Sequence, residues 1–177
     1  MSYLLFTDSS VSPQLHQAIG GYVVITRDEL SALEMFDSNT LCENIAEKIQ
    51  FLSFQSNKST FVEIKTAVLA LQAIESQQIT KIDIYTDCQN LCDLLQGRLL
   101  RLAEKNYLTK TGKVLAHAPL YQELKELAET LDLSVVKMVG HSKIKTTIEE
   151  KIFACIDKAV RSKLRAHLSS DLPQELT

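Results

Sequence analysis

Long apolar runs are missing from this 177-residue sequence, so nothing in it predicts a membrane-spanning helix and we expect no membrane partner. The first residues also lack the cationic start and apolar run of a signal peptide. The four cysteines, Cys42, Cys88, Cys92 and Cys155, form no C-x-x-C pair and have no histidine at metal-site spacing. We therefore predict a cytoplasmic protein with buried thiols. The net charge of −3 excludes a wholly basic nucleic-acid binder but allows a local basic patch.

Two short apolar stretches each end in an aspartate. Residues 3–7 precede Asp8, and residues 81–86 precede Asp87. Apolar runs of this length are typical of strands that are buried on both faces. If the two strands are neighbours in one sheet, Asp8 and Asp87 lie side by side.

The order of the expected elements predicts an α/β fold. Strands are expected at residues 3–10, 18–26, 48–54, 81–86 and 134–139, and helices at residues 60–74, 89–95, 119–131 and 147–168. Hairpin strands followed by alternating strands and helices indicate a five-stranded mixed sheet with helices on both faces. In that sheet the first and fourth strands can pair in parallel at the centre.

A single domain over residues 1–168 accounts for the length, with residues 169–177 as a flexible tail. The acidic stretch 28–47 reads as an insertion at the sheet edge, with a short strand at residues 31–36 and a helical turn at residues 41–47. We expect its deletion to leave catalysis intact. Residues 97–113 carry five cations against one acid.

Four acids are candidates for one site: Asp8, Glu63, Asp87 and Asp157. A cluster of carboxylates repels itself unless cations hold it together, and hard oxygen ligands suit Mg²⁺ or Mn²⁺. Two such ions about 4 Å apart can stabilise the attacking and leaving oxygens of a phosphodiester displacement. This grouping would indicate a nuclease.

Each acid also has a structural interpretation. Thr60 and Glu63 match a capping box, which on the residues alone is the favoured reading of Glu63. Asp87 can cap a helix starting near residue 89. Asp157 precedes Arg161 by four residues and can form a surface ion pair with it.

Two further features have alternative readings. His141 follows Gly140 in a polar loop and is either a solvated side chain or a proton carrier beside a metal site. The basic segment 97–113 is either a solvated helix face or a nucleic-acid contact.

The order of these motifs resembles type I ribonuclease H, including the related domain of retroviral reverse transcriptases. The resemblance runs from Tyr3 to about Arg165. The segments that carry it are residues 5–10, 20–22, 62–71, 84–89, 139–142 and 157–159, together with the basic segment, which falls where many members have a basic protrusion.

This resemblance implies a mechanism and a substrate. Asp8, Glu63, Asp87 and Asp157 would hold two Mg²⁺ or Mn²⁺ ions, and His141 would assist proton transfer or product release. The substrate would be the RNA strand of an RNA·DNA hybrid, recognised through its 2′-hydroxyls. The residues that would contact the substrate are Ser9, Ser10, Thr60, Gln89, Arg98, Arg101 and Lys105.

The sequence departs from the family pattern at several positions. Ser9 replaces the usual glycine, Thr60 stands where an asparagine commonly contacts the hybrid, and Phe153 stands where an asparagine often precedes the last acid. Two alternatives to a hybrid-cleaving enzyme therefore stay open. One is a nucleic-acid-binding or regulatory protein with weakened catalysis, and the other is another nuclease of the same fold.

Overall fold

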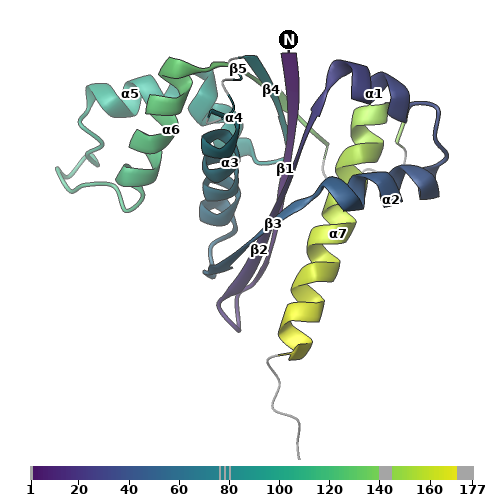
Figure 1. Ribbon diagram of the computed structural model, residues 1–177. Coiled ribbons are helices and arrows are strands. Elements are labelled where there is room, and N and C mark those ends of the chain that lie inside the picture. The colour runs from purple at the N-terminus through teal and green to yellow at the C-terminus, as the bar shows by residue number, and fades with distance from the viewer. Residues whose placement is uncertain (1, 76, 78, 80, 140–144, 171–177) are drawn as a thin grey trace, which may run out of the picture.

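A five-stranded mixed sheet forms the centre of the computed structural model, which describes residues 2–75, 77, 79, 81–139 and 145–170 (Figure 1). The strand order is β3-β2-β1-β4-β5. The strands are β1 (Ser2–Ser12), β2 (Gln17–Thr26), β3 (Gln50–Gln55), β4 (Lys81–Thr86) and β5 (Asp132–Lys137). The helices are α1 (Arg27–Leu33), α2 (Ser38–Lys48), α3 (Ser59–Glu75), α4 (Gln89–Asp93), the π-helix η1 (Leu94–Arg98), α5 (Leu99–Glu104), α6 (Ala118–Thr130) and α7 (Ile148–Ser170).

The two strands that lead to Asp8 and Asp87 are neighbours, as predicted, but Asp8 does not end its strand, because β1 continues to Ser12 through its pairing with β2. β1 pairs in parallel with β4, with Phe6 opposite Tyr85, and pairs antiparallel with β2 on its other side. Leu4, Leu5 and Phe6 are fully buried although they point alternately to opposite faces of the sheet. Burial on both faces is the reason why this strand reads as a continuous apolar run.

Helices cover both faces of the sheet, which confirms the predicted fold class. The helices α3, α4, α5 and α6 lie on one side, and α1, α2 and α7 lie on the other (Figure 1). Leu5 packs with the α3 group, whereas Leu4 and Phe6 pack with the α7 group. No described helix has the length and apolar character needed to cross a membrane.

The segment expected to be an insertion is part of the core. Residues 31–36, predicted as a strand, instead belong to α1 and the turn after it. Thr26 and Glu29 form a capping box at the start of α1, and this favours a helix over a strand. Leu41 and Ile45 of α2 are buried among residues of α7 and the sheet. The prediction of a surface excursion at the sheet edge is therefore wrong.

Two of the cysteines are joined rather than free. Cys42 of α2 and Cys155 of α7 form a disulfide across a sequence separation of 113 residues, with their Cα atoms 5.2 Å apart. Cys88 and Cys92 are buried thiols, as predicted for all four. The prediction failed for Cys42 and Cys155 because their pairing depends on the packing of α2 against α7, which no local pattern reveals.

Candidate active site

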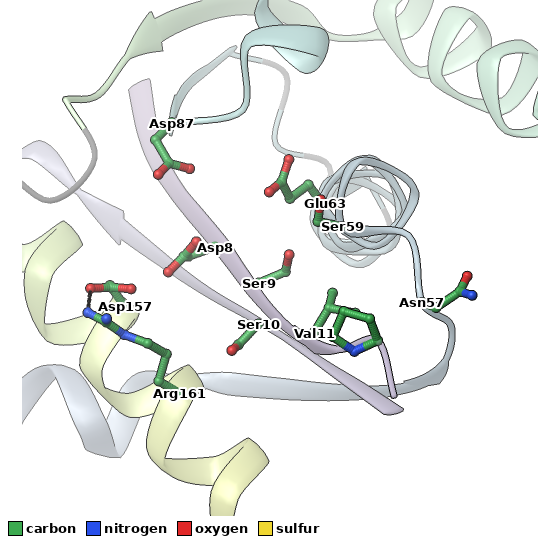
Figure 2. A pocket seen from close by; sticks show the side chains of 11 residues that line it. Asp8, Ser9, Ser10, Val11, Asn57, Ser59, Glu63, Asp87, Asp157 and Arg161 are labelled. Atoms are coloured by element: carbon green, nitrogen blue, oxygen red, sulfur yellow. Dashed lines mark hydrogen bonds and ion pairs between the residues drawn. The ribbon is translucent and has the colours of Figure 1, made fainter. Parts of the chain in front are cut away.

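A pocket of about 420 Å³ opens at the carboxyl ends of β1 and β4 (Figure 2). Its lining consists of Asp8, Ser9, Ser10, Val11, Pro13, Asn57, Ser59, Glu63, Asp87, Asp157 and Arg161. The four predicted acids are all among these residues. They come from four different elements or their ends, namely β1, α3, the end of β4, and α7.

The sheet register places Asp8 and Asp87 together. Phe6 stands opposite Tyr85 in the parallel pair, so Asp8 and Asp87 are each two residues beyond matched positions. Asp8 still pairs with Gly21 of β2 and is buried. Asp87 follows the last residue of β4 and leads into α4. The parallel pairing therefore brings both carboxylates to the same edge of the sheet.

The absence of a side chain at Gly20 sets the position of Glu63. A Cβ atom at Gly20 would lie 2.0 Å from Oγ1 of Thr66, so α3 can approach β2 this closely only over a glycine. Thr66 is three residues after Glu63 on the same helix, and residues at this spacing share a face. Close packing at Thr66 thus brings Glu63 to the pocket.

The next glycine has the same effect on the opposite face. A Cβ atom at Gly21 would lie 2.5 Å from Cγ2 of Val160, so α7 also packs directly on the β2 backbone. Val160 is three residues after Asp157. Because Gly20 and Gly21 stand opposite Ser9 and Asp8, the two helices bring their acids to the two sides of the same part of β1. In Figure 2 the Asp8 carboxylate lies between Asp157 and Glu63.

The crowded carboxylates change the proton affinity of the site. Burial raises the pKa of Asp8 to about 8, and the negative charges of Asp87, Asp157 and Glu63 add to that effect. A hydrogen bond from the backbone at Ser9 acts in the opposite direction. Burial is also the main cause of the raised pKa of Glu63. The pocket therefore disfavours negative charge unless a cation accompanies it.

Three side chains, Cys88, Lys137 and Arg161, partly compensate for this charge. The Cys88 thiol hydrogen bonds to Glu63, and the positive charge of Lys137 lowers the pKa of Glu63. The Lys137 ammonium also donates to the backbone carbonyl of Asp87. Arg161 forms an ion pair with Asp157, as predicted from their spacing, and both residues line the pocket. The ion pair and the pocket position of Asp157 are thus compatible.

The capping interpretations of Glu63 and Asp87 are wrong. Helix α3 begins at Ser59, so Thr60 lies within its first turn rather than at its cap, and Glu63 is free to line the pocket. The residue that caps α4 is Cys88, whose sulfur accepts a hydrogen bond from the Leu91 backbone N–H at 3.4 Å. Helix α3 starts one residue earlier than expected, whereas α4 starts at Gln89 as expected but takes Cys88 as its cap, and both carboxylates are therefore free of a capping role.

The donor chemistry of the pocket suits a hard divalent cation because carboxylate oxygens dominate it. Among the described residues, however, no group of three or more His, Cys, Asp or Glu side chains could hold a metal ion as it stands. Three of these carboxylates would therefore have to move toward one another to bind the same ion directly, whereas Mg²⁺ often binds only one or two carboxylates and keeps several waters.

The other predicted residues are placed differently. Ser9 and Ser10 line the pocket, and Ser9 Oγ is buried without a hydrogen-bond partner among the described residues. Thr60 is half-buried in α3 outside the pocket lining, and Gln89 is exposed and donates to Asp93. Arg98 contacts Asn90, while Arg101 and Lys105 are exposed near the end of α5. His141 lies outside the described residues.

Sequence reasoning missed Asn57, Ser59 and Lys137. Asn57 and Ser59 line the pocket because the turn between β3 and α3 passes along its rim (Figure 2). Lys137 ends β5 opposite Thr86, which brings its side chain to Asp87. A cation at the end of the strand that pairs with β4 was a signal available in the sequence.

The strand order β3-β2-β1-β4-β5, with helices on both faces, is that of a ribonuclease H-like fold. A sequence profile of the RNase H family matches residues 1–161. The chain belongs to the RNase H family. No curated protein sequence matches it.

Solved structures agree on the fold. The solution structure of the PFV RNase H domain superposes with a TM-score of 0.65 at 17% sequence identity, covering 94% of this chain and 97% of that domain. A foamy viral protease-reverse transcriptase in complex with an RNA/DNA hybrid gives a TM-score of 0.65 at 14% identity, covering 93% of this chain and 20% of that protein. At such low sequence identities these superpositions show a shared fold alone.

Proposed function

We propose that this protein is a metal-dependent endonuclease that hydrolyses the RNA strand of RNA·DNA hybrids. The observation that carries the proposal is the convergence of Asp8, Glu63, Asp87 and Asp157 on one pocket from four separate parts of the chain. Membership of the RNase H family supports the reaction class. The foamy viral protein solved with an RNA/DNA hybrid supports the choice of substrate.

In this proposal the four carboxylates hold two Mg²⁺ or Mn²⁺ ions. Such ions, when bound, activate water and stabilise charge on phosphoryl oxygens. The raised pKa of Asp8 means that its carboxyl group must lose a proton before it can act as a ligand. Arg161 limits the repulsion at Asp157, and His141 would carry a proton or assist product release.

The substrate contacts form two groups. Ser9 and Ser10 line the pocket and would contact the strand being cleaved, with Thr60 and Gln89 farther out. Arg98, Arg101 and Lys105 would bind phosphates of the hybrid, because cations that neutralise phosphates supply most of the affinity for nucleic acid. Discrimination of RNA from DNA would depend on the 2′-hydroxyl.

Cleavage assays with Asp87→Asn test the assigned site. The substrates are a labelled RNA·DNA hybrid, duplex DNA, duplex RNA and single strands, each with Mg²⁺ or Mn²⁺. We expect hybrid-selective cleavage by wild type and a rate loss of at least about 100-fold in the variant. Asp132→Asn is the matched control, since Asp132 is exposed on β5 and pairs with Lys81. Equal rates for Asp87→Asn and wild type would refute the assignment.

Ion binding can be measured without activity. A ligand that binds the folded state alone raises the melting temperature by an amount that grows with the ligand concentration relative to its dissociation constant. Mg²⁺ should raise the melting temperature of wild type and raise that of Asp8→Asn by a smaller amount. An equal rise for both proteins would refute Asp8 as a ligand.

A second candidate is a hybrid-binding protein with little or no turnover. One observation favours it: Asp157 is already paired with Arg161. This candidate predicts hybrid binding in EDTA and no cleavage in Mg²⁺ or Mn²⁺. The same assays therefore separate the two functions.

A further inference from the structure

The charge of α7 changes sign along its length. Its first turn carries Glu149 and Glu150, and Asp157 is its last acid. From residue 158 to residue 170 the sequence has no acid and four Lys or Arg side chains. The protein as a whole is acidic, so this half-helix differs sharply from the average surface.

Three of these cations form a stripe on one side of the helix. Lys158, Arg161 and Arg165 are spaced by three and four residues, which places them on one helical face, and all three are exposed. We call them the cation stripe. Arg161, the middle member, also lines the candidate active-site pocket, so the stripe touches the pocket wall and continues along α7 to Arg165.

The stripe has charge available for a partner. Neither Lys158 nor Arg165 forms an ion pair with any described residue, whereas the fourth cation, Lys163, has its ammonium 5.6 Å from the centre of the Phe51 ring. Glu43 of α2 lines the same hollow as Lys158. The unbalanced positive charge therefore increases toward Arg165.

The spacing of the stripe fits a phosphate backbone. Seven residues of α-helix rise about 10 Å, and one strand of a duplex carries one phosphate per roughly 3.4 Å of helix axis. Three cations over this length can therefore contact about three phosphates. The helix α7 and the basic α5 segment lie on opposite faces of the sheet (Figure 1). The stripe is thus a separate surface from Arg98, Arg101 and Lys105.

We infer that Lys158, Arg161 and Arg165 bind the phosphate backbone of a nucleic-acid strand as it leaves the pocket. The inference rests on the proposed function for the identity of the ligand. Nucleic acid would then be held on both sides of the sheet, by α5 and by α7.

Binding of a labelled RNA·DNA hybrid by fluorescence anisotropy tests the inference. The measurements are made in EDTA, where no metal-dependent cleavage takes place, between about 50 and 200 mM salt. The test variant is Lys158→Gln with Arg165→Gln, which leaves the pocket residue Arg161 in place. The control is Lys48→Gln with Lys125→Gln, which makes the same change in net charge at two surface ion pairs. Circular dichroism and melting confirm that all three proteins are folded.

A plot of the logarithm of the binding constant against the logarithm of salt concentration has a negative slope, to which each phosphate contact contributes about −0.9. Loss of two phosphate contacts should therefore make the slope less negative by about 1.8. If the test variant and wild type bind equally at 1 M salt, this change in slope means that the variant binds about 60-fold more weakly than wild type at 0.1 M salt. The control variant should bind as wild type does.

Equal slopes and affinities for the test variant and wild type would overturn the inference, as would an equal loss in the control variant. Wild-type binding without cleavage in Mg²⁺ or Mn²⁺ would defeat the proposed endonuclease alone. In that case a reduced slope in the test variant would still establish the stripe as a contact surface.

Discussion

Asp8→Asn should make the metal-free protein more stable, and the gain should grow with pH. The folded-state pKa of Asp8 is about 8, against an ordinary value of 3.8, because the group is buried beside other carboxylates. Folding therefore favours the protonated form. The stabilisation of the folded protein that comes from keeping Asp8 protonated is fully present below about pH 4 and is lost progressively as the pH rises to about 8.

The size of the change in the free energy of unfolding follows from the raised pKa of Asp8. One pKa unit corresponds to 1.36 kcal/mol, so the free energy of unfolding of wild type should fall by up to about 1.4 kcal/mol per pH unit within this window. Between pH 5 and pH 8 the total is at most roughly 4 kcal/mol. Asparagine has nearly the same shape and does not ionise, so the variant lacks this dependence. The difference between the two proteins should widen with pH and level off above pH 8.

Urea unfolding in EDTA at pH 5, 6, 7 and 8 measures the difference. Asp83→Asn is a suitable control because Asp83 is equally buried but accepts a hydrogen bond from Ser134 at 2.6 Å and pairs with Arg27. That variant should be destabilised by about 1–3 kcal/mol. A constant difference between wild type and Asp8→Asn from pH 5 to pH 8, or one that narrows, would refute the reasoning about the pocket.

Three further predictions concern the framework of the site. Gly20→Ala should destabilise the protein by about 1–3 kcal/mol in urea unfolding, because the added Cβ would lie 2.0 Å from Thr66 Oγ1. Adding Thr66→Ala to this variant should restore part of the lost stability. A double variant that regains nothing would argue against this contact. Cys42→Ser should lower stability by up to about 5 kcal/mol, the chain-entropy value for so long a loop, and should abolish any effect of a reductant on the urea midpoint. Identical midpoints for oxidised and reduced wild type would contradict a stabilising disulfide. Leu41→Ala should lower the free energy of unfolding by about 2–5 kcal/mol because Leu41 is only 1% exposed. Met35→Ala, at an 87% exposed position, should change it by less than about 0.5 kcal/mol. Similar values for the two variants would mean that α2 is not part of the core.

Local patterns identified the elements that carry the acids. The apolar runs before Asp8 and Asp87 predicted two buried strands, and the structure contains both as neighbours in parallel. The three-and-four spacing of apolar residues predicted most of α3, including its buried Ile64, Ala67 and Leu71. These predictions succeeded because strand and helix periodicity reflects burial along a single element, which the sequence records directly.

Other features depend on contacts between distant segments. The disulfide joins residues 113 positions apart, and α1 with α2 becomes part of the core only by packing on α7 and the sheet. Glu63 illustrates the difference most clearly. On the residues alone a capping box was the better interpretation, since that motif is local and complete within four positions.

The sequence by itself determined the strands and helices that carry the four acids, although residues 31–36, predicted as a strand, form helix and turn instead. Tertiary structure decided that these acids share a pocket. The physical reason is the close approach of α3 and α7 to the Gly20–Gly21 backbone from opposite faces, which brings Glu63 and Asp157 to the part of β1 that carries Asp8. Such a convergence requires three elements to pack at once, so no pattern within one element could specify it.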